Sequence, residues 1–418
     1  MSLLLIDIFK NTQMFINIIL TIFTVYFTCI ALFSLMKDKE YKKVNPLKRF
    51  AILVAARNEE VVLPNLIESL KNQTYPSDLY DIVIIPNNCS DNTEKIALEN
   101  GAKVFNCPLP VSSKGDALNQ YFDSIIKNPN NYDAFCIFDA DNIVNHDYLE
   151  RVNDALCNGV KVGQGYRESK NPTDTVISGS YSIYYYMIDR FYNRARAVLD
   201  ISCLINGSGF VVSREIIEKF NGWHTKTMTE DIEFSTLCVL AGEKVQWIPD
   251  AKFFDEQPLT FEQSWKQRKR WTTGCIQGLQ TYGWRLLVSS IKNRCRSSLD
   301  FLMFYLTPCI QGLCFVSFVL MVNTSVLYLK VEMYDKIHVF IYLWYLFIFI
   351  SIGVLTSTAA LKLENKDYKK MTKSLFYFWF FIVSWVPINV ICLFKKQTVW
   401  HPIEHTRAVT INEISNLI

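Results

Sequence analysis

The sequence lacks the signals of several common functional classes. Its twelve cysteines include no CxxC pair of the kind that binds zinc. They are scattered through apolar stretches, which indicates free thiols in a reducing compartment. The formal net charge of +3 over 418 residues is too small to indicate a nucleic-acid partner. The GxGxxG sequence of dinucleotide-binding folds is also absent.

What the chain does contain is a mixture of apolar and charged segments. Half of the residues are hydrophobic and a fifth are charged, so we expect a soluble domain and membrane segments in one chain. Four apolar runs are long enough to cross a hydrocarbon core of about 30 Å as helices. They are 14–36, 299–322, 338–361 and 375–394. No small-residue cleavage pattern follows the first run, which favours a retained helix over a signal peptide.

The basic residues predict an orientation in the membrane. Only Lys10 precedes the first run, whereas six lysines and arginines lie between 37 and 49. By the positive-inside rule the domain that follows is cytoplasmic, and so is the lysine-rich loop 362–373. Three further crossings would nevertheless put the basic residues after 394 outside. Either the last run bends at Pro387 and does not cross, or the charge rule fails there. A cytoplasmic tail 395–418 would form either a lid over the site or a solvated end.

Polar residues follow several predicted strands of the soluble region. The strand 134–138 ends in Asp139 and Asp141, at the position where ligands bind in open α/β sheets. Carboxylates two residues apart suit a divalent cation that also holds a diphosphate, which indicates a nucleotide-sugar site. The strand 81–85 runs into a polar loop with Asn87 and Asp91, which is either a site loop or only a capped turn. Lys114 begins a helix, where it would meet a phosphate or be an ordinary solvated lysine.

Together these motifs resemble those of the family 2 glycosyltransferases, in the membrane-embedded branch that includes cellulose, hyaluronan and poly-N-acetylglucosamine synthases. The similarity covers roughly residues 48 to 285. It rests on Ala-Ala-Arg-Asn-Glu-Glu, Asn-Cys-Ser-Asp-Asn-Thr, Lys-Gly-Asp-Ala-Leu-Asn, Phe-Asp-Ala-Asp-Asn, Thr-Glu-Asp at 229–231 and Gln-Arg-Lys-Arg-Trp at 267–271, in that order. The resemblance implies a GT-A-type, Rossmann-like mixed-sheet catalytic domain inserted between transmembrane helices.

The resemblance also implies a role for each matching residue. Asp139 and Asp141 match the motif for the diphosphate and for Mn²⁺ or Mg²⁺, with Asp141 the more direct metal ligand, and Asp231 matches the general base. The remaining matches are Gln267 and Arg270 facing the diphosphate, Trp271 as acceptor platform, and Asp91 and Lys114 near the nucleotide. One departure is an amide, Asn87 or Asn88, where the family usually has an acidic residue at the nucleoside. An amide still hydrogen-bonds a base or ribose.

The chemistry of these residue types agrees with those roles. Displacing a nucleoside diphosphate builds negative charge on the leaving group, which a cation and a guanidinium stabilise. A carboxylate in a partly desolvated pocket accepts the proton of the attacking hydroxyl, and we assign this to Asp231. With one base and no obvious nucleophile, a single displacement with inversion to a β product is expected. Gly207 and Ser208 lie in a tight loop that we expect to contact the acceptor.

Two other segments have open interpretations. The aromatic stretch 178–192 either lines an acceptor groove or packs as a half-buried helix. Residues 276–298 mix apolar and basic side chains, as in an amphipathic helix at the cytoplasmic membrane face. We therefore expect an N-terminal helix with a basic flank in 1–47, the catalytic domain in 48–275, the interfacial helix in 276–298, and transmembrane helices in 299–394.

The expected protein is an integral plasma-membrane β-glycosyltransferase that uses a nucleotide diphosphate sugar, with UDP as the preferred nucleotide. The first hypothesis is processive synthesis of a cell-surface polysaccharide, in which accessory membrane subunits would be possible partners. Four helices are few for a polymer pore, so non-processive glycosylation of a membrane lipid is the alternative. A third hypothesis, from another class, is a catalytically idle subunit that binds a sugar nucleotide. Activity that persists when Asp231 is replaced by asparagine would favour it.

Overall fold

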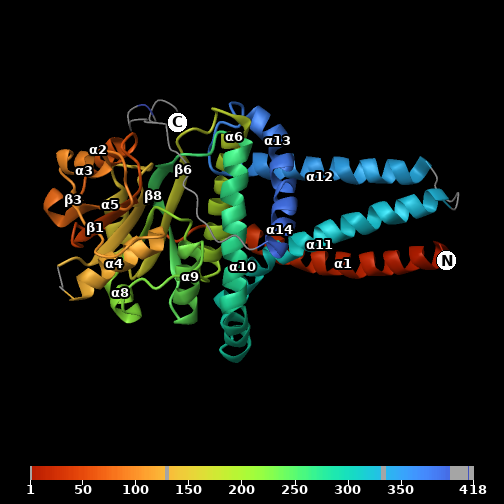
Figure 1. Ribbon diagram of the computed structural model, residues 1–418, viewed down its shortest axis with the longest axis horizontal. Helices are drawn as coiled ribbons and strands as arrows, with labels where there is room; N and C mark the ends of the chain where they lie inside the picture. The colour runs from red at the N-terminus through yellow and green to blue at the C-terminus, as the bar shows by residue number, and fades with distance from the viewer. Residues whose placement is uncertain (1, 128–130, 331–335, 396–412, 414–418) are drawn as a thin grey trace.

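The computed structural model describes residues 2–127, 131–330, 336–395 and 413. Its soluble part is built on one mixed eight-stranded sheet with the order β3-β2-β1-β4-β7-β6-β8-β5 (Figure 1). The strands are β1 Phe50–Ala56, β2 Tyr80–Pro86, β3 Lys103–Val104, β4 Ala134–Asp139, β5 Ile143–Val144, β6 Val162–Ser169, β7 Phe210–Ser213 and β8 Val245–Asp255. Strands β3, β2, β1 and β4 are parallel, and β7 is antiparallel to both of its neighbours, β4 and β6.

Helices cover both faces of this sheet, because side chains alternate between the two faces along each strand. Phe50, Ile52 and Val54 of β1 belong to the hydrophobic cluster on the face covered by α2, α3 and α5, whereas Ala51 and Leu53 face α4, α8 and α9. These helices are α2 Leu63–Lys71, α3 Thr93–Glu99, α4 Lys114–Lys127, α5 Tyr148–Cys157, α8 Arg214–Phe220 and α9 Glu230–Leu240. The short 3₁₀ helix η2, Ser77–Leu79, precedes β2.

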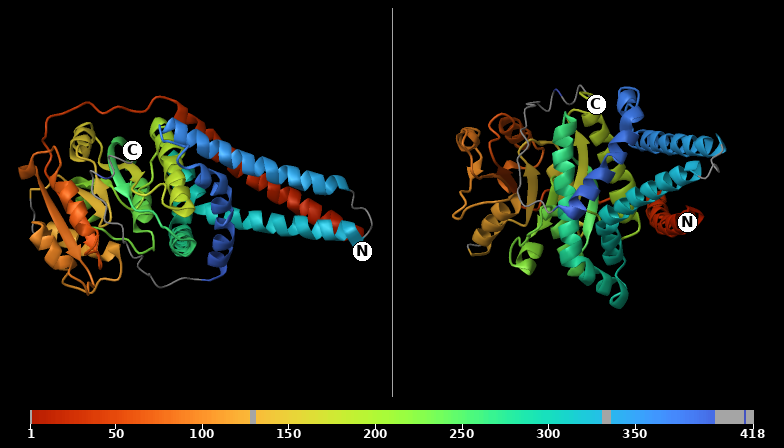
Figure 2. Two further views of the ribbon diagram at one scale, coloured as in Figure 1. Left: turned by 90° about the horizontal axis from the view of Figure 1, so that it is seen from above. Right: turned by 45° about the vertical axis from the view of Figure 1, so that its right-hand side comes forward.

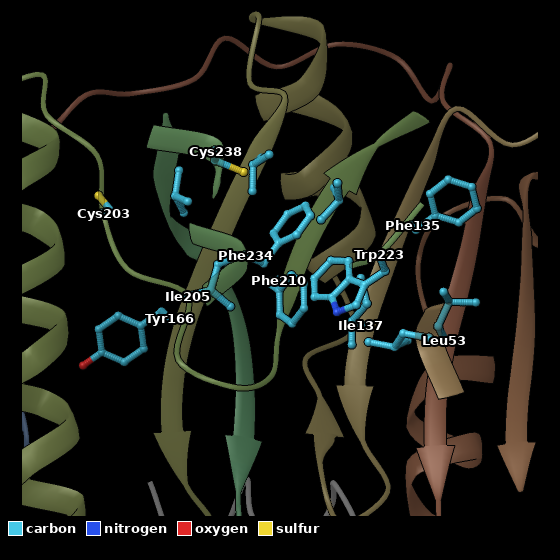
Figure 3. Close-up of a cluster of buried hydrophobic side chains, with 14 of the residues drawn as sticks. Leu53, Phe135, Ile137, Tyr166, Cys203, Ile205, Phe210, Trp223, Phe234 and Cys238 are labelled. Carbon is cyan, nitrogen blue, oxygen red and sulfur yellow. The ribbon is translucent and has the colours of Figure 1, made fainter. Parts of the chain in front are cut away.

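The second of these clusters is the larger one, and aromatic stacking fills its centre (Figure 3). The Trp223 ring lies 3.9 Å from the Phe234 ring in a stacked arrangement and 6.0 Å from the Phe210 ring. The cluster continues beyond the sheet to residues of the C-terminal region, namely Leu361, Met371, Leu375, Phe378 and Phe381. The sheet region and the apolar C-terminal helices therefore share one hydrophobic core.

Two long helical segments link the sheet to the apolar helices. The aromatic stretch predicted from the sequence forms α6, Val176–Met187, followed by the π-helix η3, Ile188–Arg194, and α7, Ala195–Val198. Helix α10 runs without interruption from Phe261 to Lys292 and opens with a capping box formed by Thr260 and Gln263. The Gln-x-x-Arg-Trp residues and the amphipathic segment are thus parts of one helix, which continues across the boundary expected between 275 and 276.

Four helical segments are long and apolar enough to cross a membrane: Leu4–Leu35, Arg296–Tyr328, Leu346–Leu363 and Thr372–Phe394. They correspond to α1 Ser2–Leu32 with the 3₁₀ helix η1 Phe33–Leu35, to α11 Arg296–Lys330, to α12 Lys336–Leu363, and to the pair α13 Thr372–Val383 and α14 Trp385–Phe394. Four apolar runs were expected, at similar positions. The first three helices extend from the soluble part in the same direction (Figures 1 and 2).

The last segment has a different course from the other three. It is broken at Ser384, three residues before Pro387, into α13 and α14. Figure 1 shows this pair running across the base of α1, α11 and α12, alongside α10. It is also the most buried of the four, with 39% of its most apolar window inside the protein. The lid or tail predicted for 395–418 lies outside the described residues, apart from 395 and 413.

Candidate active site

The carboxyl ends of three parallel strands meet at one edge of the sheet. In the strand register Ala55 is opposite Asp139, and Ala56 is opposite Pro86. The loops that follow β1, β2 and β4 therefore begin side by side, and they carry the polar residues singled out in the sequence. This edge is the position at which open α/β sheets bind ligands.

Lys114, the first residue of α4, joins two of the predicted site loops. Its Nζ donates to Oδ1 of Asp139 at 2.6 Å and to the backbone oxygen of Gly207 at 2.7 Å. Burial lowers the pKa of Lys114, but Asp139 and Glu230 more than offset this, so the pKa is raised and the ammonium stays charged. The structure thus pairs Lys114 with a carboxylate rather than leaving it as a solvated lysine, and its contact with a phosphate remains a prediction.

Asp141 lies deeper than Asp139 and is 3% exposed. The Asn142 amide donates to Oδ1 of Asp141 at 3.4 Å and to Oδ1 of Asp255 at 2.8 Å. Lys170 Nζ, itself buried, donates to the backbone oxygen of Asp141 at 2.6 Å. The two predicted metal-binding carboxylates are therefore two residues apart at the end of β4, and hydrogen bonds from Asn142 and Lys170 fix the side chain and backbone of Asp141.

The donor set is compatible with a divalent cation held jointly with a substrate. Among the described residues no group of three or more His, Cys, Asp or Glu side chains is arranged to hold a metal alone. Mg²⁺ and similar hard cations are often bound by one or two carboxylates, substrate phosphates and water. Asp139 and Asp141 fit that mode, in which the diphosphate completes the coordination.

Behind this loop is a buried ion pair that the sequence analysis did not identify. Arg167 on β6 donates through Nε to Oδ2 of Asp255 at 3.1 Å and through Nη1 to the backbone oxygen of Asn206 at 2.5 Å. Burial raises the pKa of Asp255 to about 6, although Arg167 opposes this. A weak signal was present, because Asp255 follows the apolar pair Phe253 and Phe254 at the end of β8. Its partner could not be seen without the pairing of β6 with β8.

Asp231 lies in the first turn of α9, facing the loop of Gly207. A Cβ atom placed on Gly207 would lie 3.7 Å from Oδ2 of Asp231, and the glycine has a positive φ of 85°. Burial raises the pKa of Asp231 to about 7, Glu230 adds to this, and the Ile232 backbone N–H and Lys114 oppose it. A carboxylate with a pKa near neutrality is suited to act as a general base.

Ser208 has a different position from the one expected of an acceptor-binding residue. It is fully buried, and its Oγ accepts from the Asp139 backbone N–H at 3.0 Å and donates to Oδ1 of Asn142. Its place is behind the metal loop, where it holds Asp139 in position. Gly207 lies in front, between Lys114 and Asp231. The contacts of Gly207 and Ser208 with an acceptor remain predictions.

Asn87 and Asp91 both tie the loops after β1 and β2 together. The Asn87 amide donates to the backbone oxygen of Ala56 at 3.1 Å. Asp91 accepts from the Glu60 backbone N–H at 3.1 Å and from the Thr93 hydroxyl at 2.6 Å. Despite some desolvation, these hydrogen bonds lower the pKa of Asp91. Both residues lie at the predicted edge, and their contacts with a nucleotide remain predictions.

The Gln-x-x-Arg-Trp residues lie in the first half of α10. Trp271 packs near two half-buried rings from other helices, Tyr184 at 6.4 Å and Trp385 at 6.2 Å between ring centroids. Arg270 is half-buried, and Oε1 of Gln267 is a buried oxygen without a hydrogen-bond partner among the described residues. Helix α10 approaches the loop of the predicted base closely, because the Met228 backbone N–H donates to Gln277 at 2.9 Å.

The fold and this edge together define a class of protein. A mixed α/β sheet with acidic residues at the end of β4, a half-buried carboxylate opposite them and apolar helices long enough to cross a membrane is the architecture expected of a GT-A glycosyltransferase. The sequence matches the family model "Glycosyl transferase family group 2" over residues 134–357. The chain belongs to this family, so the predicted family, GT-A fold and glycosyltransferase activity are confirmed.

Its relatives fall into more than one functional group. The probable glycosyltransferase YdaM of Bacillus subtilis is 25% identical over 388 residues, 87% of this chain and 88% of that protein. A poly-beta-1,6-N-acetyl-D-glucosamine synthase of Staphylococcus epidermidis is 26% identical over 376 residues, 87% and 86% of the two chains. A beta-monoglucosyldiacylglycerol synthase of Trichormus variabilis is 30% identical over 267 residues, 62% of this chain and about half (55%) of that protein.

A solved structure supports the fold over nearly the whole chain. The mannosyltransferase of Pyrobaculum calidifontis, determined with GDP-Man and Mn²⁺, superposes with a TM-score of 0.59 and 14% identity. The match covers 95% of this chain and 100% of that one. At this identity the similarity establishes the shared fold, including helices outside the sheet domain.

Proposed function

We propose that this protein is a membrane-integrated, inverting β-glycosyltransferase that transfers a sugar from a nucleotide diphosphate sugar, preferably a UDP-sugar, to an acceptor at the membrane surface. The observation that carries this proposal is the position of Asp231. It is half-buried opposite Gly207, has a pKa of about 7, and lies close enough to Lys114 for that lysine's charge to oppose the shift of its pKa. Lys114 in turn contacts Asp139. Lys114 thus links the predicted general base, Asp231, to the loop that carries the predicted metal ligands.

On the donor side, Asp139 and Asp141 would hold Mn²⁺ or Mg²⁺, which would supply positive charge to the leaving diphosphate. Arg270 and Gln267 of α10 would orient the same group. Lys114 contributes a further positive charge beside Asp139. The Arg167–Asp255 pair and Ser208 keep the loop that carries the two carboxylates fixed during transfer.

On the acceptor side, Asp231 would accept the proton of the attacking hydroxyl as the bond to the anomeric carbon forms. No second residue is assigned as a nucleophile. Attack therefore comes from the face opposite the diphosphate, and an α-linked donor gives a β-linked product. Trp271 would support the acceptor at the end of the site nearest the membrane helices.

The course of the apolar helices supports a cytoplasmic catalytic domain at the plasma membrane. If α1, α11 and α12 cross the bilayer while α13 and α14 lie along its surface, the basic segments 37–49 and 362–373 and Lys395 fall on one side (Figure 1). That arrangement satisfies the positive-inside rule. It also removes the conflict at the C-terminus that four crossings would create.

Three crossing helices favour a membrane lipid as the acceptor. A sugar polymer within hydrocarbon needs polar partners on all sides, because unsatisfied polar groups cost several kcal/mol each. Three helices in one chain offer less enclosure than the four expected from the sequence. We therefore propose the lipid acceptor first. Elongation of a cell-surface polysaccharide is the second candidate, favoured by the nearly full-length similarity to poly-beta-1,6-N-acetyl-D-glucosamine synthase, and it would require helices from an accessory subunit or a second copy.

A product assay tests the proposal. Detergent-purified protein is supplied with diacylglycerol, a divalent cation and labelled nucleotide sugars, and chloroform-soluble label is separated from polymer at the chromatographic origin. We expect EDTA and Asp231→Asn to abolish transfer. The matched control is Asp200→Asn, at an exposed carboxylate paired with Lys244. Label in polymer alone would reject the lipid acceptor. Transfer undiminished in Asp231→Asn would reject the assigned base.

A further inference from the structure

The break between α13 and α14 is held by a buried arginine of the Gln-x-x-Arg-Trp segment. Arg268 is completely buried. Its Nη1 donates to the backbone oxygen of Phe381 at 3.0 Å and to Oγ of Ser384 at 2.8 Å, and its Nε donates to the backbone oxygen of Ser264 at 3.3 Å. Within the described part of the chain it forms no ion pair with a carboxylate. Such a residue is unusual, because buried charges are normally paired.

In place of a carboxylate, aromatic rings and a helix C-terminus stabilise the positive charge of Arg268. Its guanidinium lies 4.5 Å from the centre of the Phe381 ring and 5.4 Å from that of Trp385, within the range of cation–π attraction. The Phe381 carbonyl belongs to the last turn of α13, where the helix dipole is negative. These partners belong to the break itself, whereas the Ser264 carbonyl and the Phe261 ring, 5.7 Å from the guanidinium, belong to α10. Part of the stabilisation of the Arg268 charge therefore depends on the geometry of α13 and α14.

The geometry of the break sets the position of Trp385, the first residue of α14. Its ring lies 6.2 Å from Trp271 with an interplanar angle of 32°, and 5.2 Å from Tyr184. The Tyr184 ring is in turn stacked on Trp271 at 21°. These three rings come from α6, α10 and α14, and each is half-buried, whereas Tyr181 and Phe381 behind them are buried. The three form the outer layer of the aromatic cluster.

A second set of hydrogen bonds fastens α14 to its neighbours. Thr272, next to Trp271 in α10, donates to Oδ1 of Asn389 at 2.6 Å. The Asn389 amide donates to Gln311 of α11. Thr272 and Asn389 are both buried. The polar contacts along α10 thus fix α14 at two points, Ser384 and Asn389, with Trp385 between them.

We propose that Trp385 is a second ring of the acceptor platform, and that Arg268 is the positioning residue that places it beside Trp271. This inference rests on the proposed function and adds to it the residues that bind the acceptor. Neighbouring, half-exposed aromatic faces suit the C–H face of a sugar ring or of a polyol headgroup, which packs on an aromatic surface while its hydroxyls stay hydrogen-bonded. A soluble glycan and a glycolipid share that chemistry, so both serve as acceptor probes.

The first test replaces Trp385 by leucine. The matched control is Trp379→Leu, because Trp379 is a half-buried tryptophan of α13 that has no ring contact with Trp271 among the described residues. For Trp385→Leu we expect the acceptor KM to rise by about three- to tenfold, as for the loss of one stacked ring, with the nucleotide dissociation constant unchanged. For Trp379→Leu both constants should stay at the wild-type value. An unchanged acceptor KM in Trp385→Leu would overturn the proposal while leaving the proposed function intact.

The second test asks whether Arg268 acts through Trp385. Arg268→Gln keeps hydrogen-bond donors but removes the charge, and Ser384→Ala is a milder change at the same contact in case the first variant does not fold. We expect either variant to raise the acceptor KM but to add little in a Trp385→Leu background. Full additivity would reject the positioning role. Binding of the glycan and lipid probes, measured without donor, separates the two proposals. If a probe binds in a way that depends on Trp385 but no sugar is transferred, the proposed function fails and the acceptor platform stands. If no probe binds to the wild-type protein, the acceptor platform is overturned.

Discussion

The charged neighbours of Asp231 give a prediction about the pH dependence of activity: removing the negative neighbour and removing the positive neighbour should shift it in opposite directions. Burial and the neighbouring Glu230 raise its pKa to about 7, and Lys114 opposes them. The general base must be ionised, so kcat/KM should fall as the pH drops through this value. With a pKa of about 7, roughly a tenth of the molecules carry the ionised base at about pH 6 and roughly nine-tenths at about pH 8.

Glu230→Gln removes the negative charge next to the base. We expect the pKa of Asp231 to fall by roughly one unit, within the range that a nearby charge produces. The ionised fraction at about pH 6 then rises to about one half, so kcat/KM increases about fivefold there and changes by less than about a tenth at pH 8. Lys114→Met removes the opposing positive charge and should move the same acidic limb to higher pH.

The assay is the pH dependence of kcat/KM at saturating metal between about pH 5.5 and about pH 9. The position of the acidic limb, rather than its height, is compared, because Lys114→Met is also expected to weaken donor binding. Each variant controls the other. If both shift the limb in the same direction, or if neither moves it, the titrating group is not Asp231 and the assignment of the base fails.

Three further predictions concern stability and topology. A Cβ on Gly274 would overlap the side chain of Thr229, so Gly274→Ala should lower the free energy of unfolding, measured by thermal unfolding, by about 1–3 kcal/mol. The control Gly283→Ala meets only the flexible end of Leu279 and should be neutral or stabilising. Equal effects would contradict this packing. Arg167→Met leaves Asp255 buried without its partner and should cost about 3–5 kcal/mol, and a loss below about 1 kcal/mol would show that the pair is dispensable. Green fluorescent protein fused after Lys395 should fluoresce in a bacterial host, whereas an active periplasmic phosphatase at that point would mean that α13 and α14 cross.

The sequence was sufficient for the parts of the site that follow strand ends. Asp139 and Asp141 could be located because an apolar run stops at them, and Asp231 because it lies in a compact motif. Contacts between distant segments were not accessible in this way. Arg167 and Asp255 meet only through the pairing of β6 with β8.

Three other features were also not accessible from the sequence, for similar physical reasons. Ser208 was assigned by its glycine-rich loop, but loop composition does not reveal which side chain points inward. The start of α10 was missed because its first turns are polar and carry no apolar periodicity. For the apolar run 375–394 the sequence left open a full crossing or a bend at Pro387, because length does not specify direction; the structure breaks the run at Ser384, and the pair lies alongside α10 (Figure 1).

The shared hydrophobic core has a consequence for how the protein is made. Side chains of α13, among them Leu375, Phe378 and Phe381, complete the same cluster as Trp223 and Phe234 beneath the sheet. A ribosome releases α13 only after α11 and α12, so in the proposed topology the nascent sheet stays without part of its apolar cover until those two helices have entered the bilayer. Maturation of the enzyme would then depend on its own insertion, and a chain cut before α11 should be captured by chaperones or proteases rather than accumulate as a soluble transferase.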